Sequence, residues 1–148
     1  MKTKSLPLLF VCLLILCVVR PAPAAGPDAP AEPMGRLILA MSTDAAAVFD
    51  GAILIGTVAL KRGHPVTMLL RLDAVKVAVA ANHYAVGDTS LGVRLKAFME
   101  AGGMVIAGGK CMKMMGLKPG DLIPGVAMGT PDLVMGTLFE DGARILSY

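Results

Sequence analysis

The amino-acid sequence predicts an α/β domain with three layers, α/β/α, built on a mainly parallel sheet of about five strands. Two observations predict it. Short apolar runs alternate with helical segments over about 110 residues, which is the pattern of a parallel sheet with helices on both faces. Some of these runs are apolar throughout, as expected for strands that are covered on both faces. The chain has 148 residues, 55% of them hydrophobic, which is enough for one compact domain.

Residues 1–25 have the pattern of a secretory signal peptide. Lys2 and Lys4 form a basic start, residues 6–19 are an apolar stretch of 14 residues, and residues 22–24 supply small side chains for cleavage. A membrane-spanning helix needs about 20 apolar residues, so a retained anchor is only the secondary interpretation. We therefore expect a periplasmic or secreted protein without a stable membrane anchor.

Residues 26–34 contain three prolines in nine positions and predict an extended tether, so the folded domain is expected to cover residues 35–148. The net charge of +3 comes from the leader, because removing Lys2, Lys4 and Arg20 leaves 11 basic and 11 acidic residues. A neutral chain without tryptophan, with two tyrosines and four phenylalanines, has neither the basic surface nor the aromatic platforms of a nucleic-acid-binding protein. We expect no nucleic-acid partner.

The first half of the domain predicts a strand over residues 37–41, a helix over 45–62 and a second strand over 66–72. Gly63 and Pro65 end the helix. This helix is apolar nearly all round, whereas a helix on a sheet needs only one apolar stripe. The surplus, comprising Phe49, Ile53, Leu54, Ile55 and Val58, predicts a contact with a second subunit and hence a homo-oligomer.

The second half continues the alternation. Residues 73–90 stay open, since Val75, Val77 and Val79 alternate as in a strand while the spacing also allows a short helix. The later elements are expected to be a helix over 91–99 capped by Thr89 or Ser90, a strand over 104–107, a short helix over 112–115, a turn over 118–120, a strand over 126–128, a helix over 131–140 and a strand over 143–146. The active edge of such a sheet is the edge where its strands end.

The most distinctive segment follows the third strand and contains Cys111. Cys12 and Cys17 leave with the leader, so Cys111 is the only cysteine of the domain and no internal disulfide can form. Gly108 and Gly109 let the backbone approach a ligand or partner closely. Lys110 lies beside Cys111 near a helix start, which favours the thiolate form that attacks sulfur or binds a soft metal. The alternative is a small buried side chain without chemistry.

Other candidates are expected around the same edge. Thr43 and Asp44 follow the first strand and Asp73 follows the second, although Thr43 and Asp44 also suit a helix cap and Asp73 a turn. His83 lies in a loop that can reach the site, whereas His64 precedes a proline and is expected in a surface turn. The nucleotide-binding P-loop pattern is absent. We expect no cofactor and no resident metal.

The segment GGKCMKMMGLKPGDLIPGV and the closing ARILSY resemble the DsrE-like family, which includes the TusD and DsrE sulfur-relay subunits. The resemblance spans about residues 35–148. It implies flavodoxin-like subunits in an oligomer, and a cysteine that accepts sulfane sulfur as a persulfide and passes it to a partner thiol. Carried over to this sequence, Cys111 is the sulfur carrier, and its partners are thiol- or persulfide-bearing donors and acceptors. The chain is then a sulfurtransferase-like carrier.

Two departures from the family pattern stand out. Many relatives have a second cysteine where this chain has Gly108, so a two-thiol redox cycle within one subunit is excluded; the leader also separates this chain from cytoplasmic relays. Two rival functions stay open. Cys111, Met112, Met114 and Met115 offer one thiolate and three thioethers, a donor set that suits Cu(I). A structural oligomer without thiol chemistry is the other.

Overall fold

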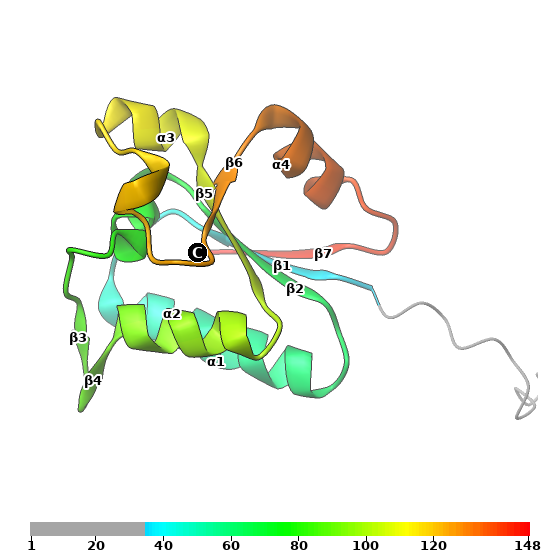
Figure 1. Cartoon of the computed structure of the whole chain (residues 1–148). Helices are drawn as coiled ribbons and strands as arrows, with labels where there is room; N and C mark the ends of the chain where they lie inside the picture. Colours follow the sequence, from blue (N-terminus) through cyan, green and yellow to red (C-terminus); the bar gives the residue numbers. More distant parts are fainter. Residues whose placement is uncertain (1–34) are drawn as a thin grey trace, which may run out of the picture. The chain divides into compact units, whose positions relative to one another are not determined.

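The computed structural model describes residues 35–148 and confirms the predicted fold class (Figure 1). Five parallel strands form one sheet in the order β6-β5-β2-β1-β7, with helices on both of its faces, as in a three-layer flavodoxin-like fold. The predicted signal peptide (residues 1–25) and tether (residues 26–34) lie outside the described residues, so both stay predictions.

The elements follow the predicted alternation. The sheet strands are β1 (Leu37–Met41), β2 (Val66–Leu70), β5 (Met104–Gly108), β6 (Ala127–Gly129) and β7 (Arg144–Ser147). The α-helices are α1 (Ala46–Lys61), α2 (Leu91–Glu100), α3 (Gly109–Met114) and α4 (Pro131–Leu138). Two short 3₁₀ helices, η1 (Leu72–Ala78) and η2 (Pro119–Asp121), and a hairpin of β3 (Ala85–Val86) and β4 (Thr89–Ser90) complete the domain.

Several bounds differ from the prediction by one to three residues: the strand expected over 66–72 ends at Leu70, the helix expected over 131–140 ends at Leu138, and the strands expected over 126–128 and 143–146 each begin one residue later. The open segment 73–90 forms η1 and then the β3–β4 hairpin, and Val75 and Val77 are both buried on η1 although their alternation also suits a strand. Helix α3 begins at Gly109, three residues earlier than expected. The reason is that Gly108 is both the last residue of β5 and the N-cap of α3, with no loop between them, so Cys111 falls within the first turn of α3.

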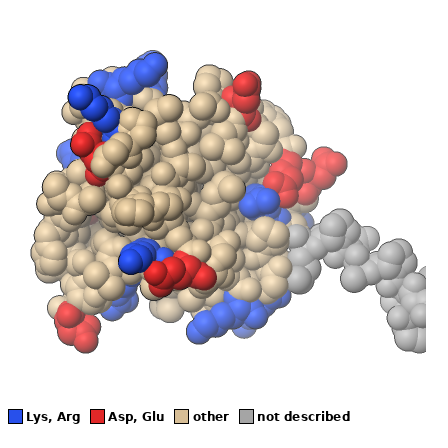
Figure 2. All heavy atoms as spheres, viewed as in Figure 1, with Lys and Arg blue, Asp and Glu red and all other residues tan. Residues whose placement is uncertain are grey.

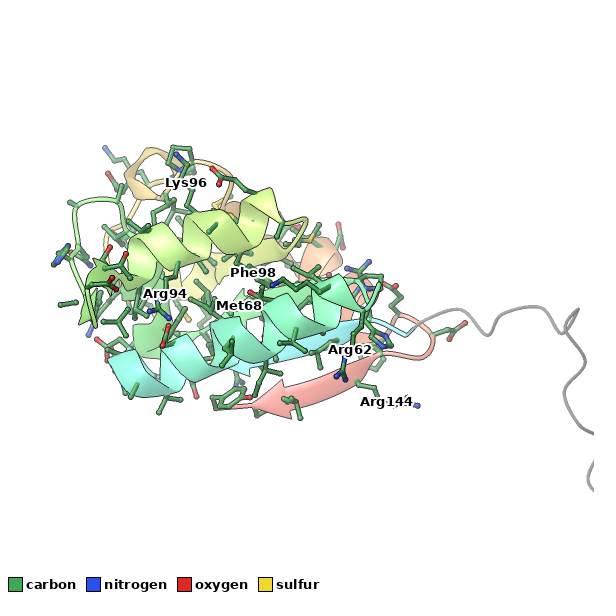
Figure 3. All side chains as sticks on the ribbon, turned by 90° about the horizontal axis from the view of Figure 1, so that it is seen from below. Arg62, Met68, Arg94, Lys96, Phe98 and Arg144 are labelled. Carbon is green, nitrogen blue, oxygen red and sulfur yellow. The ribbon has the colours of Figure 1, made fainter. Side chains whose placement is uncertain are left out.

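Helices α1 and α2 cover one face of the sheet, and the main core lies between them and the strands (Figure 3). Phe49, Met68 and Phe98 are fully buried there, and Ser90 caps α2 by accepting a hydrogen bond from the Val93 amide. Phe49 and Ile53 were predicted to belong to a subunit contact, and this is wrong for both. They face the chain's own core, because they lie on the stripe of α1 that faces the sheet and fill the space above β1 and β2.

The opposite face is held partly by polar contacts. Arg36 precedes β1, and its guanidinium contacts the carboxylate of Glu140 at 2.6 Å and donates to the hydroxyl of Thr67 at 3.0 Å. Thr67 is fully buried on β2, so this hydrogen bond satisfies its polar atom and ties the end of α4 to the sheet. Among residues 35–148, no helix is both long and apolar enough to cross a membrane.

Candidate functional site

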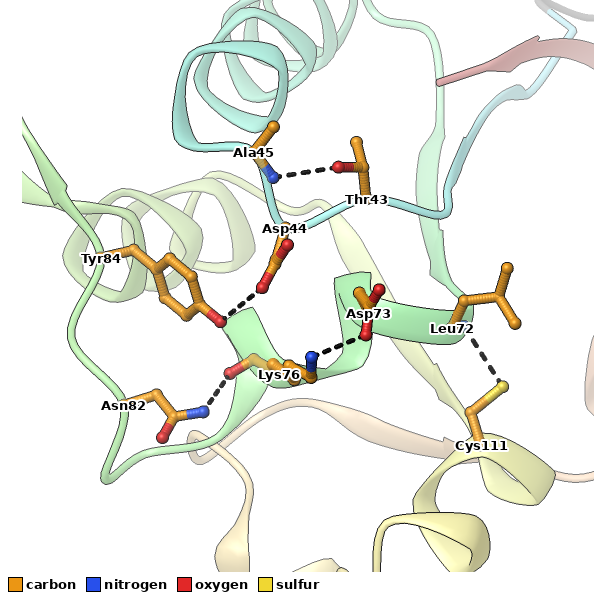
Figure 4. Close-up of polar contacts among 9 residues, drawn as sticks. All are labelled: Thr43, Asp44, Ala45, Leu72, Asp73, Lys76, Asn82, Tyr84 and Cys111. Atoms are coloured by element: carbon orange, nitrogen blue, oxygen red, sulfur yellow. Dashed lines mark hydrogen bonds and ion pairs between the residues drawn. The ribbon is translucent and has the colours of Figure 1, made fainter.

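The loops that follow β1, β2 and β5 meet at the carboxyl edge of the sheet (Figure 4). The loop after β1 carries Thr43 and Asp44, β2 leads into Leu72 and Asp73, and β5 leads into Cys111. The strands are parallel and adjacent in the order β5-β2-β1, so their ends bring these three segments together. The loops that carry Thr43, Asp44, Asp73 and Cys111 therefore lie at one edge, and a functional site there stays a prediction.

Cys111 is the third residue of α3, and its side chain is only half-buried. Its Sγ accepts a hydrogen bond from the backbone N–H of Leu72, with an N–S distance of 3.3 Å. A side chain at Gly108 would place its Cβ 3.6 Å from this sulfur, and one at Gly109 would lie 2.5 Å from the carbonyl oxygen of Gly129. Gly109 thus allows a close approach to β6, whereas a Cβ at position 108 would make an ordinary contact with the sulfur and a tight one, 3.1 Å, with the Leu70 carbonyl oxygen.

Leu72 has an unusual backbone for its residue type. Its φ is +49°, in the left-handed region, where a leucine is strained by about 1–3 kcal/mol. At Leu72 the chain turns from β2 into η1, and this turn directs the Leu72 N–H toward the sulfur of Cys111. Its side chain is exposed, so the position is an apolar residue at the surface beside the thiol.

A polar cluster lies at the same edge of the sheet (Figure 4). The Tyr84 hydroxyl donates to the carboxylate of Asp44 at 3.0 Å, and the Lys76 ammonium contacts Asp73 at 2.6 Å. Burial of Tyr84, together with the hydrogen bond to Asp44, raises the pKa of its hydroxyl, so it stays protonated and remains a donor. The hydrogen bond and charge of Asp73 likewise raise the pKa of Lys76.

The remaining predicted site residues are placed as follows. Lys110 is exposed on α3 next to Cys111, and the Thr43 hydroxyl accepts a hydrogen bond from the Ala45 amide at 3.1 Å, at the start of α1. His83 is exposed and lines a surface cavity of about 240 Å³ together with Ser90, Val93 and Lys96. The Nδ1 of His64 lies 3.3 Å from the Gly35 carbonyl oxygen, at the opposite edge of the sheet.

The methionines that follow Cys111 differ in burial. Met112 is 1% exposed and belongs to the core, Met114 is 77% exposed, and Met115 packs partly buried against the core. Successive helical positions diverge by about 100°, which separates Met112 and Met114 around α3. Within residues 35–148 no three His, Cys, Asp or Glu side chains gather in a metal-binding group. The Cu(I) alternative, which depends on thioethers, stays a prediction.

Three contributions to this site were missed by the sequence reasoning: the Leu72 amide, the Tyr84 hydroxyl and the Lys76 ammonium. Asp73 and Lys76 are three residues apart, a helical spacing that was a usable signal once η1 was recognised. Tyr84 lies in the same loop as Asn82 and His83, and of this loop only His83 was predicted to reach the site. Nothing in the sequence marks Leu72, because leucine rarely adopts a left-handed backbone.

Comparisons with solved structures find the same fold elsewhere. The YchN protein of E. coli matches with a TM-score of 0.66 at 15% identity, over 78% of this chain and 99% of its own. A protein of unknown function from Methanobacterium thermoautotrophicum, MTH1491, matches with a TM-score of 0.56 at 12% identity, over 77% and 99%. A conserved protein of unknown function from Bacteroides thetaiotaomicron, BT1422, matches with a TM-score of 0.57 at 19% identity, over 76% and 94%.

No protein-family model matches the sequence, and no curated protein matches it either. The structural matches support the DsrE-like fold that the sequence resemblance implies. At these identities they are evidence for the fold alone. The chemistry of this chain has to be argued from its own residues.

Proposed function

We propose that the chain is a sulfane-sulfur carrier, related to the DsrE-like sulfur-relay proteins, in which Cys111 holds the sulfur as a persulfide. The observation that carries the proposal is the Cys111 sulfur itself, half-exposed at the carboxyl edge of the sheet and hydrogen-bonded by the Leu72 amide at 3.3 Å. A sulfur sealed in the core would be out of reach of any donor. A backbone N–H aimed at sulfur stabilises negative charge on it.

The transfer needs no oxidant or cofactor. The Cys111 thiolate attacks the outer sulfur of a donor persulfide, a new S–S bond forms on Cys111, and the donor's S–S bond breaks as the donor thiolate leaves. The proton of the persulfide moves with the transferred sulfur. An acceptor thiolate then attacks that outer sulfur, and the Cys111 thiolate is the leaving group. In both steps one S–S bond forms and one breaks.

The local residues suit these steps. Gly108 leaves space beside the Cys111 sulfur, and Leu72 directs its amide there. Among residues 35–148, Cys111 is the only cysteine, so no second thiol of the same domain can attack the persulfide and release it. A persulfide on Cys111 is therefore expected to persist until a partner's thiol arrives. The partners are thiol- or persulfide-bearing molecules outside the chain.

The first prediction is that the chain gains one sulfur atom on Cys111 when it is incubated with glutathione persulfide. Mass spectrometry of the intact chain measures the gain, and peptide mapping distinguishes Cys111 from Cys12 and Cys17. Cys111→Ser is expected to lose this labelling completely, because a serine hydroxyl cannot form a persulfide. Equal labelling of Cys111→Ser, or no labelling of Cys111 in the wild-type chain, contradicts the proposal and leaves the purely structural role.

We further propose that the outer face of α1 packs against a second copy of the chain. Leu54 is 64% exposed, and Ile55 and Val58 are exposed beside it. No charged side chain interrupts the helix from Gly51 to Leu60, and Ala47 and Gly51 are small enough for a second helix to approach closely. A two-fold axis through this face would cover the same side chains on both copies.

The second prediction is that Leu54→Glu converts the oligomer to a monomer, because it places an unpaired charge in an apolar contact. Val93→Glu is the matched control: Val93 is 61% exposed on α2, and the same change there is expected to leave the oligomer intact. Light scattering coupled to gel filtration measures both. A wild-type chain that is already monomeric, or a Leu54→Glu chain of unchanged mass, overturns the proposed contact.

A further inference from the structure

Basic side chains gather on the surface around the proposed sulfur site. Figure 2 shows them at the top of the molecule, over the position of α3 in Figure 1. Lys110 and Lys113 belong to α3, Lys118 follows it, and Arg71 precedes Leu72, the residue whose amide contacts the Cys111 sulfur. All four are exposed. We refer to these four residues as the basic rim.

The basic rim is not neutralised within the domain. Among residues 35–148, no carboxylate lies within 4.0 Å of these four cations, whereas Arg36, Lys76, Arg94 and Lys96 each have an acidic partner. The nearest acids in sequence are Asp73, which pairs with Lys76, and Asp121, which accepts a hydrogen bond from the Lys118 backbone amide at 2.7 Å. Lys61, Arg62 and Arg144 are likewise exposed without an ion pair, away from Cys111, but the four cations of the basic rim come from the segments that flank the Cys111 sulfur.

Exposed apolar side chains lie within the same surface. Leu72 and Met114 are both exposed, one on the η1 side of Cys111 and the other on α3. Apolar side chains surrounded by charges are typical of a surface that binds another protein. The cations and these two apolar side chains are all exposed, so together they offer a surface that a partner protein can cover.

We infer that the basic rim docks an acidic surface of the protein that exchanges sulfur with Cys111. This inference rests on the proposed function, and it names the chemistry of the partner. Acidic side chains around the partner's thiol would pair with Lys110, Lys113 and Arg71, while an apolar side chain near that thiol would cover Leu72 or Met114. The charges bring the two sulfur atoms together faster than diffusion between neutral surfaces does.

The test uses thiol–disulfide exchange, which does not depend on persulfide chemistry. Two peptides are compared, each with a single cysteine capped as a mixed disulfide with an aromatic thiol, one with glutamates and one with lysines on both sides of it. The Cys111 thiolate attacks the peptide sulfur, a mixed disulfide forms and the aromatic thiolate leaves, which gives an absorbance signal. An uncharged small disulfide corrects for any change in the intrinsic reactivity of the thiol.

At low salt the acidic peptide is expected to react about tenfold faster than the basic peptide, and the ratio should approach one at high salt. The double variant Lys110→Glu, Lys113→Glu is expected to reverse the preference. Lys61→Glu, Arg62→Glu changes the net charge equally at the far end of α1 and should keep the wild-type ratio. Equal rates for the two peptides, or an unchanged ratio in the α3 variant, overturn the inference.

The two proposals fail separately. A wild-type chain that prefers the acidic peptide but gains no sulfur from glutathione persulfide keeps the docking surface and loses the sulfur-carrier function. A chain that gains sulfur on Cys111 and shows no peptide preference keeps the function and loses the acidic partner.

Discussion

A chain that carries Gly108→Cys is expected to lose its bound sulfur within the time of the labelling experiment. A Cβ at position 108 lies 3.9 Å from the Cβ of Cys111, within the range of about 3.5–4.5 Å found in disulfides. The φ of Gly108 is −58°, which any L-residue adopts without strain. The introduced thiolate can therefore attack the inner sulfur of the Cys111 persulfide, forming an internal disulfide and releasing hydrosulfide.

This prediction is measured as sulfide released per chain and as the mass of the protein afterwards. The variant should end without the added sulfur and two hydrogens lighter than its reduced form, whereas the wild-type chain keeps the sulfur. Gly108→Ser is the control, since it introduces the same Cβ, 3.1 Å from the Leu70 carbonyl oxygen, without a thiol. If Gly108→Ser loses the sulfur equally, the cause is distortion of the site and not attack by the second thiol.

The layers of the fold and the edge at which the candidate site residues gather could be predicted from sequence because both follow from short-range patterns. The strand predicted over residues 37–41 and the helix predicted over 45–62 are confirmed, the first without change and the second within one residue at each end. A continuous apolar run determines the strand, and Gly63 and Pro65 determine where the helix ends. Once the order of strands and helices is known, the loops after parallel strands lie at one edge.

The contacts inside the site could not be predicted, because they depend on which loops meet. Cys111 and Leu72 are 39 positions apart, and Tyr84 reaches Asp44 across 40. No periodicity in the sequence encodes such a contact. The partition of α1 illustrates a second limit: the composition shows more apolar residues than one stripe needs, but only the packed structure assigns Phe49 to the core and Leu54 to the surface. His83 is another example of this limit, because the sequence does not determine which side of the hairpin a loop residue faces.

Phe98→Ala is expected to destabilise the domain by about 3–5 kcal/mol, a large part of the 5–15 kcal/mol typical of a domain. Phe98 is 1% exposed and lies between α2 and the sheet (Figure 3). A Cβ at Gly103 would lie 2.3 Å from its ring and one at Gly56 2.9 Å, so both glycines are needed to make room for it. Truncating the ring leaves a cavity that these two backbones cannot fill, because neither has a side chain.

Urea unfolding followed by circular dichroism measures this loss, and Phe139→Ala is its matched control. Phe139 is 80% exposed after α4, so the same truncation there is expected to change the free energy of unfolding by less than about 0.5 kcal/mol. The contrast also bears on function. Phe98→Ala changes the core and none of the residues around Cys111, so its sulfur loading is expected to decline only at urea concentrations where the domain itself unfolds. Equal stability of the two variants would contradict the assignment of Phe98 to the core.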